Sequence, residues 1–150
     1  FDEVSVLCQS RRSRDPMPAS TDRVHLGDTM GEMDFYYAAA DVAVIGGSFV
    51  PRGGQNLIEA CAAGVPVVLG PSMFNFAEAT RLALEAGAAV QAADAPGAIR
   101  EALRLLSNPE ERKKMGAAGR ALCESHRGAT QRHVDACRAL LSGARAGSLA

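Results

Sequence analysis

Short apolar runs alternate with amphipathic stretches along this chain. Residues 41–45 and 65–69 are mostly apolar and β-branched, which is typical of buried parallel strands. Ile99, Leu103 and Leu106 recur with helical spacing. We predict strands at residues 24–26, 41–45, 65–69 and 88–92, and helices at residues 1–10, 32–40, 54–63, 77–86, 96–106, 109–125 and after Gly128. This alternation predicts an α/β fold, a Rossmann-like parallel sheet with helices on both faces.

A glycine-bracketed loop follows the predicted strand at 41–45. It opens with Gly46-Gly47, carries Ser48 and Arg52, and closes with Gly53-Gly54 at the expected start of a helix. Glycines let a ligand approach the backbone closely, and the first N–H groups of a helix stabilise an anion. The loop therefore predicts a phosphate-binding site.

Three polar residues follow this loop. At helical spacing, Gln55, Asn56 and Glu59 share one side of the predicted helix. Glu59 would lie about 7.5 Å along the axis from Gly54, because each helical residue rises about 1.5 Å. That distance matches the reach from a phosphate to the ribose of a nucleotide, so we expect Glu59 to accept hydrogen bonds from the ribose hydroxyls.

A second loop of similar character, Gly27–Gly31, lies between the strand at 24–26 and the helix at 32–40. The loops at the carboxyl ends of parallel strands open into one crevice. We therefore expect it to lie beside the loop at 46–54. By itself the pattern fits a simple helix start equally well.

Composition narrows the class of protein. The chain has 150 residues, 47% of them hydrophobic, and a formal net charge of −1, which argues for one domain and against nucleic-acid binding. No stretch predicts a signal peptide or a transmembrane helix. Cys8, Cys61, Cys123 and Cys137 lack the spacing of a metal site, and the histidines lack companion ligands, so we expect no bound metal.

The sequence resembles a known family. The motifs LGDTMGEM at 26–33 and GGSFVPRGGQNLIEACAAGVPVVLGPSMFNF at 46–76 resemble the C-terminal, donor-binding domain of the 3-deoxy-D-manno-octulosonic acid (Kdo) transferases, GT-B glycosyltransferases of lipopolysaccharide synthesis. The resemblance implies the C-terminal half of a GT-B fold, lacking its first strand. With Phe1 inside an apparent helix, we expect residues 1–150 to be an excised piece without the acceptor-binding N-terminal domain, and residues 143–150 to be a frayed tail.

The same resemblance assigns roles to individual residues. It implies that Thr29, Met30, Gly31 and Glu32 contact the nucleoside, with backbone groups reading the base. We also expect Ser48 and Arg52 to assist the backbone of Gly53 and Gly54 at the phosphate, although the family pattern does not require arginine at position 52. The loop at 70–76 comes near the donor, where Asn75 either binds the ligand or caps the next helix. The implied donor-binding residues are thus Thr29, Met30, Gly31, Glu32, Ser48, Arg52, Gly53, Gly54, Gln55, Asn56, Glu59 and Asn75.

The family also implies the reaction. It transfers Kdo from CMP-Kdo to a lipid A precursor with inversion and without a metal or other cofactor, at the cytoplasmic face of the inner membrane. The catalytic base belongs to the N-terminal domain, so we expect this chain, itself soluble, to bind the donor and to be inactive alone.

Other interpretations stay open. A UDP-sugar GT-B transferase or a UDP-sugar epimerase shares the helix and the ribose carboxylate. A dinucleotide-binding module needs GxGxxG after its first strand, and residues 46–54 lack that spacing. A non-catalytic regulatory module is the third alternative. Arg11, Arg12 and Arg14 fit either a solvated loop or a surface facing anionic lipid or substrate phosphates. The run Arg112-Lys113-Lys114 predicts a solvated helix face.

Overall fold

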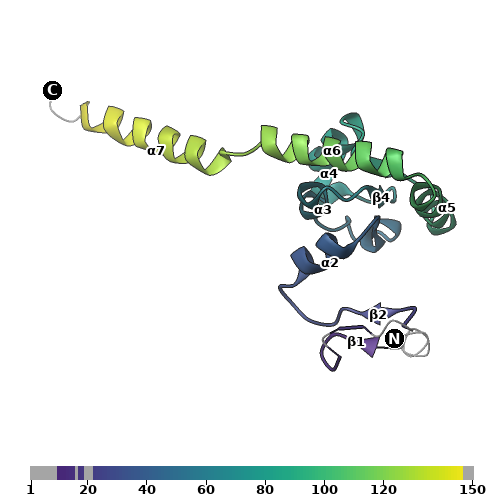
Figure 1. Ribbon diagram of the computed structural model, residues 1–150. Helices are drawn as coiled ribbons and strands as arrows, with labels where there is room; N and C mark the ends of the chain where they lie inside the picture. Colours follow the sequence, from purple (N-terminus) through teal and green to yellow (C-terminus); the bar gives the residue numbers. More distant parts are fainter. Residues whose placement is uncertain (1–9, 16, 19–21, 147–150) are drawn as a thin grey trace. The chain divides into compact units, whose positions relative to one another are not determined.

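A computed structural model describes residues 10–15, 17–18 and 22–146 (Figure 1). The chain divides into two compact units, residues 1–36 and residues 37–150. The helix predicted at residues 1–10 falls almost wholly outside the described residues.

The first unit contains a small parallel sheet. Strand β1 (Ser10–Arg11) pairs with β2 (His25–Leu26), with Ser10 opposite His25 and Arg11 opposite Leu26. The Ser10 hydroxyl and His25 Nδ1 are 2.7 Å apart across this pair. The strand at 24–26 is confirmed. Ser10 was predicted to end a helix and Arg11 to lie in a loop. Pairing with a distant segment, which local composition does not reveal, makes them a strand.

The second unit is built on a three-stranded parallel sheet in the order β3-β4-β5. The strands are β3 (Ala43–Ile45), β4 (Val67–Leu69) and β5 (Ala89–Gln91). In register, Ala43 pairs with Val67 and Val67 with Ala89. All three residues of the central β4 are buried. The three strands predicted for this part of the chain are confirmed. β3 and β4 begin later than predicted and end where predicted, and β5 is shorter at both ends.

Helices connect and cover these strands. They are α2 (Met33–Ala39), the 3-10 turns η1 (Gly46–Phe49) and η2 (Phe74–Phe76), and the helices α3 (Ile58–Ala63), α4 (Ala77–Glu85), α5 (Ala95–Leu106), α6 (Pro109–Ser125) and α7 (Ala129–Ala146). Each predicted helix in the described range is present. α7 includes residues 143–146, which were predicted to fray, and residues 147–150 lie outside the described residues.

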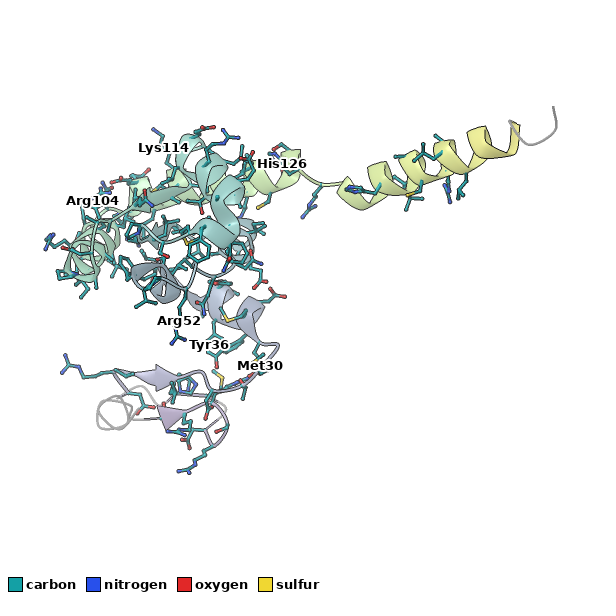
Figure 2. The ribbon with its side chains drawn as sticks, turned by 180° about the vertical axis from the view of Figure 1, so that it is seen from behind. Met30, Tyr36, Arg52, Arg104, Lys114 and His126 are labelled. Carbon is teal, nitrogen blue, oxygen red and sulfur yellow. The ribbon has the colours of Figure 1, made fainter. Side chains whose placement is uncertain are left out.

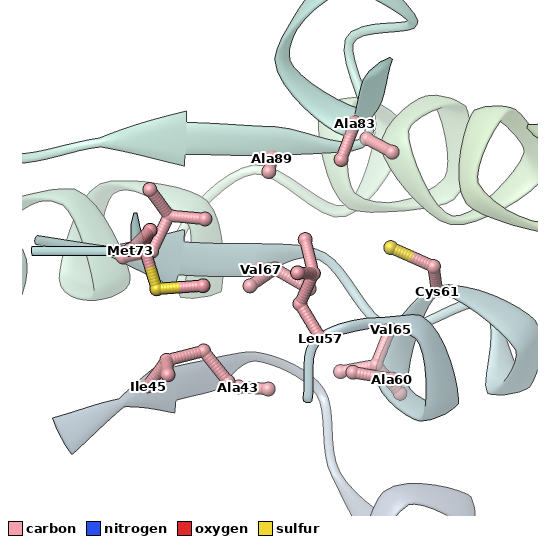
Figure 3. Packing of buried hydrophobic residues seen from close by; sticks show 12 residues of the cluster. Ala43, Ile45, Leu57, Ala60, Cys61, Val65, Val67, Met73, Ala83 and Ala89 are labelled. Carbon is pink, nitrogen blue, oxygen red and sulfur yellow. The ribbon is translucent and has the colours of Figure 1, made fainter. Parts of the chain in front are cut away.

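Alternate residues of β4 face opposite layers of the core. Val67 and Leu69 join a cluster with Leu57 and Cys61, on the side covered by α3 and α4 (Figure 3). Val68 joins Ala98 and Leu105 of α5 and Met115 of α6, together with Ala92, in a second cluster. The second unit therefore has helices on both faces of its sheet, as predicted.

Helix ends follow their local sequence. Asp94 caps α5 by accepting a 2.6 Å hydrogen bond from the backbone N–H of Gly97. Asn108 caps α6 in the same way, with Pro109 as its first residue. Gly64 ends α3 in the left-handed conformation, with φ 78°. The stop at Gly64 leads the chain into β4, and the candidate site lies in the loops that follow β3 and β4.

Candidate functional site

Ser48 lies at the base of the loop that follows β3. Its side chain is fully buried, and its hydroxyl donates to the carbonyl of Ile45. The same oxygen accepts a 2.6 Å hydrogen bond from the backbone N–H of Gly70, just after β4. Both functions of the hydroxyl are used inside the protein. We therefore correct the predicted phosphate contact of Ser48: this residue ties together the carboxyl ends of two strands.

A tight turn at Gly53-Gly54 forms the tip of the loop. Both residues have positive φ, 83° and 78°. The Gly53 N–H lies 3.4 Å from Ser72 Oγ, and the Gly53 carbonyl accepts from the backbone N–H of Asn75 at 3.2 Å. A Cβ on Gly53 would collide with the Asn75 side chain. The turn is thus held against the loop at 70–76.

The helix after this turn starts later than predicted. α3 begins at Ile58, not at Gly54, because two successive residues with positive φ cannot form the first turn of a right-handed helix. Among the described residues, the N–H groups of Gly54, Gln55 and Asn56 have no hydrogen-bond partner. The donors available to an anion are therefore those of a non-helical segment that leads into the helix.

Asn56 and Glu59 come together, although not as two positions of one helix. Asn56 Oδ1 accepts from the backbone N–H of Ile58 at 3.0 Å, and Asn56 Nδ2 donates to Glu59 Oε1 at 2.9 Å. Gln55 precedes the helix and lies against Gly47, where a Cβ would be 3.5 Å from its Cγ. The predicted helical stripe is wrong for Gln55 and Asn56. The pairing of Asn56 with Glu59 nevertheless presents an exposed, oriented carboxylate.

Two further predicted residues border the turn. Arg52 is exposed and, among the described residues, forms no ion pair (Figure 2). Asn75 donates from Nδ2 to the Arg52 carbonyl at 3.1 Å. Asn75 does not cap α4, since the residue before that helix is Phe76 and no side chain caps it. The helix-cap alternative is therefore wrong, and Asn75 braces the glycine turn.

The phenol of Tyr37 lies within reach of the Glu59 charge. The pKa of Tyr37 is raised, first by burial of its phenol and second by the negative charge of Glu59. Tyr37 packs against the core cluster around Leu57 and Val67. The Glu59 side chain is exposed, so its carboxylate is available to accept hydrogen bonds from a ligand.

In the first unit, Glu32 is the centre of a polar cluster. Its carboxylate accepts from Arg12 Nη2 at 2.7 Å and Nε at 3.1 Å, and from the hydroxyl of Thr29. These hydrogen bonds, first from Arg12 and then from Thr29, lower the pKa of Glu32 to about 2. The Arg12 guanidinium also lies 4.7 Å from the centre of the Phe35 ring. The Glu32 side chain therefore stabilises the loop, leaving backbone groups for any contact with a base.

The rest of that loop is open. Met30 is 96% exposed, and Gly31 has φ 80° with no heavy atom near its missing Cβ. Thr29, Met30, Gly31 and Glu32 belong to the first unit, whereas the predicted residues from Ser48 to Asn75 belong to the second. Within each unit, the predicted donor-binding residues lie close to one another. The expected closeness of the two loops stays a prediction.

Sequence reasoning missed two residues that shape these loops. Ser72 accepts from the Gly53 N–H, and Arg12 holds Glu32. Ser72 had a usable signal, since it follows the strand next to the glycine loop. Arg12 was noted only as one of three loop arginines, of which Arg11 also lies 3.7 Å from the Asp28 carboxylate. Arg11 and Arg12 thus contact carboxylates of their own unit, and a role facing lipid or substrate phosphates stays untested.

The described residues contain no group of three or more histidine, cysteine, aspartate or glutamate side chains placed to hold a metal ion. Within the same residues, none of the helices combines the length and the apolar character needed to span a bilayer.

Comparison with known proteins assigns this arrangement to a family. The family model described as glycosyl transferases group 1 matches residues 21–122. That range contains both glycine loops and the helices α2 to α5, together with most of α6.

Named relatives narrow the family. The chain is 53% identical over 143 residues to a 3-deoxy-D-manno-octulosonic acid transferase of Bordetella pertussis, covering 91% of this chain and 33% of the relative. It is 37% identical over 126 residues to the enzyme of the same name from Haemophilus influenzae, covering 83% of this chain and 30% of that one. The chain thus spans about a third of the length of these relatives.

A solved structure has the same fold. The crystal structure of the C-terminal CMP-Kdo binding domain of WaaA from Acinetobacter baumannii matches with a TM-score of 0.73 and 32% identity, over 81% of this chain and 67% of that one. This match confirms the predicted α/β fold of the C-terminal half of a GT-B protein and the resemblance to Kdo transferases. The chain belongs to the glycosyl transferases group 1 family.

Proposed function

We propose that this chain is the donor-binding domain of a transferase that moves Kdo from CMP-Kdo to a lipid A precursor. One observation carries the proposal. The turn at Gly53-Gly54 leads into α3 with three backbone N–H groups that have no partner among the described residues, in a chain 32% identical to a CMP-Kdo binding domain. Such a concentration of free donors favours a phosphate.

The CMP moiety would span the glycine turn and the start of α3. Its phosphate accepts from the N–H groups of Gly54 and Gln55, with Arg52 beside them as an exposed cation. Its ribose hydroxyls donate to Glu59, which Asn56 orients. Reading of the cytosine by backbone groups of Thr29 to Glu32 stays a prediction, because these residues belong to the first unit. Within that unit, Arg12 and Thr29 donate hydrogen bonds to the Glu32 carboxylate and so order this loop.

Leaving-group stabilisation is the chemical role of this domain in the proposal. Negative charge grows on the CMP phosphate as the bond to Kdo breaks, and prepositioned N–H donors stabilise it without reorganising. These donors do the work that a metal ion does in other transferases, so we propose a metal-independent reaction. The acceptor hydroxyl attacks from the opposite side of the sugar, which inverts the anomeric centre.

The remaining parts of the reaction lie outside this chain. We propose that an N-terminal domain supplies the base that deprotonates the acceptor hydroxyl and binds the lipid A precursor, so the 150 residues alone catalyse no transfer. Because the acceptor is a lipid, the whole protein would work at the inner membrane surface. The relatives, three times as long as this chain, have room for such a domain.

Calorimetric titration with CMP, UMP, UDP and NAD tests the proposal. We expect tightest binding of CMP, without divalent metal and at low salt. Preference for UDP would favour a UDP-sugar enzyme, and preference for NAD would favour a dinucleotide module. No binding by any of the four, in a chain shown to be folded by circular dichroism, would count against donor binding by these residues alone.

A further inference from the structure

A polar pocket of about 290 Å³ lies in the second unit, between the end of α3, the start of β3 and the first turns of α6. Its lining includes Asp41, Arg112, Lys113 and Arg120. The lining thus contains three cationic side chains and one carboxylate. The donor site proposed above uses none of these residues.

This pocket lies at the opposite end of the sheet from the glycine turn. Asp41 comes two residues before β3, and Pro66, also in the lining, comes directly before β4. The loops with Ser48 and Ser72 follow the other ends of the same strands. Three-residue strands span roughly 10 Å at about 3.3 Å per residue, so one ligand phosphate cannot occupy both places.

Backbone carbonyls hold the two arginines in place. Arg112 Nη1 donates to the carbonyls of Leu105 and Leu106 at the end of α5, at 3.0 and 2.5 Å. Arg120 Nη2 donates to the carbonyl of Ala63 at 2.8 Å, at the end of α3. Each guanidinium has five N–H groups, and these contacts use only some of them. The rest are fixed in orientation, which reduces the entropy lost on binding.

Glycines shape the wall between these arginines. A Cβ on Gly64 would collide with the Arg120 guanidinium, and a Cβ on Gly116 would collide with the Gly64 carbonyl. α6 therefore lies directly against the turn that ends α3. Both glycines line the pocket, and any larger side chain at either position would fill space beside the arginine.

Lys113 is the lining cation that forms neither an ion pair nor a hydrogen bond with another described residue, and it is exposed. Asp41 is the only acidic lining residue, and it lies 3.4 Å from Arg112 Nη2. Three positive groups against one negative group leave an excess of positive charge in a concave, polar site.

We propose that this pocket binds a phosphate group. Arg112 and Arg120 present oriented N–H donors, and Lys113 closes over the anion as a mobile cation. The phosphate is either that of a free small molecule or the headgroup of an anionic lipid. Either source gives the domain a second anion site, separate from the donor nucleotide and independent of the function proposed above.

Residue-resolved NMR titration of the chain with inorganic phosphate, at constant ionic strength, tests this. We expect saturable shifts of the Gly64 and Gly116 amides, followed separately from those of Gly53 and Gly54. Lys113→Gln should weaken binding at the pocket by about threefold to fivefold, as expected for one exposed charge contact, and Lys113→Glu further. Lys114→Gln is the matched control, because Lys114 is exposed on the same helix and does not line the pocket.

Vesicle co-flotation then separates the two sources of phosphate. Binding to phosphatidylglycerol–phosphatidylcholine vesicles, weakened by Lys113→Gln and not by Lys114→Gln, assigns a lipid headgroup. Phosphate binding without vesicle binding assigns a free phosphate compound. The proposal is overturned if phosphate produces no saturable shift at Gly64 and Gly116, or if the two lysine variants bind phosphate equally well.

Discussion

The backbone N–H of Gly70 donates a 2.6 Å hydrogen bond to the hydroxyl of Ser48, across the carboxyl ends of β3 and β4. Because Ser48 is fully buried, its removal leaves this N–H without a partner and without water. We expect Ser48→Ala to lower the free energy of unfolding by about 1–3 kcal/mol. Urea denaturation at constant slope measures the loss.

Ser72→Ala is the matched control for that change. The Ser72 hydroxyl accepts from Gly53 over 3.4 Å in a partly buried place, so its loss should cost less than about 1 kcal/mol. Equal losses for the two alanine variants would mean that burial of Ser48 does not govern its contribution.

Glu59 is expected to matter for ligand binding and little for folding. Its carboxylate is exposed, and Asn56 is its hydrogen-bond partner. Glu59→Ala should weaken CMP binding by about 1–3 kcal/mol, the range for loss of a charged acceptor. Calorimetry on Glu59→Ala and on Glu110→Ala, an exposed glutamate of α6, makes the comparison. Unchanged CMP affinity in folded Glu59→Ala removes this residue from the ribose site.

The glycine turn gives a steric prediction. A Cβ on Gly54 would collide with the Met73 sulfur in addition to straining a φ of 78°. Gly87 has φ 71° and open space around its missing Cβ, so Gly87→Ala reports the φ strain alone, about 1–2 kcal/mol. We expect Gly54→Ala to lose more stability than Gly87→Ala in thermal unfolding. Similar losses would show that Met73 moves aside freely.

The closeness of Met73 to Gly54 also affects how a bulkier variant at position 54 must be interpreted. Gly54→Val is expected to abolish nucleotide binding, and the first cause is the collision with Met73 rather than occupation of the anion site. Loss of binding in that variant would therefore not locate the phosphate. Glu59→Ala is the cleaner test.

The Glu32 carboxylate predicts a pH dependence within the first unit. Hydrogen bonds from Arg12 and Thr29 lower the pKa of Glu32 from 4.5 to about 2. A carboxyl whose pKa is lower in the folded state adds stability above its unfolded pKa and loses it as the pH falls. The contact should thus stabilise the loop above pH 4.5 and weaken progressively towards pH 2.

Side-chain carbon NMR of Glu32 against pH measures this. Arg12→Gln should move the midpoint upwards, towards 4.5, and Arg14→Gln, which changes an exposed arginine nearby, should leave it in place. An unshifted midpoint in Arg12→Gln would show that Arg12 does not hold the carboxylate in solution.

The thiols are expected to react in order of burial. Burial raises the pKa of Cys61 to about 11, with the neighbouring Cys123 adding to the effect, whereas Cys137 is exposed. Thiolate is the reactive form, so at pH 8 a disulfide reagent should modify Cys137 rapidly and Cys61 only after unfolding. Mass spectrometry of timed samples distinguishes the sites. Early modification of Cys61 in the folded chain would contradict its placement in the core.

The sequence predicted the strands and helices better than the side-chain hydrogen bonds of the candidate site. Residues 65–69 were identifiable as a strand because burial on both faces requires a continuous apolar run. The similar run at 41–45 also forms a strand, although Val44 on one of its faces is 48% exposed. Local pattern placed the start of α3 at Gly54, since the sign of φ at a glycine is not visible in sequence. Ser48 resembled a ligand residue because its partner, Gly70, lies 22 positions away. Arg12 and Glu32, 20 positions apart, were likewise beyond any local pattern.

The close packing of α6 on α3 limits how far the chain can be shortened from its C-terminal end. α3 has six residues, too few for an isolated helix to be stable. It lies against a surface from which side chains are absent at Gly116 and Gly119, where a Cβ on Gly119 would be 3.0 Å from the Cys61 carbonyl. A chain shortened to end after α5 would keep every strand and every loop of the candidate site. It would still lose the support that positions Glu59, so the smallest working version of this domain extends through α6.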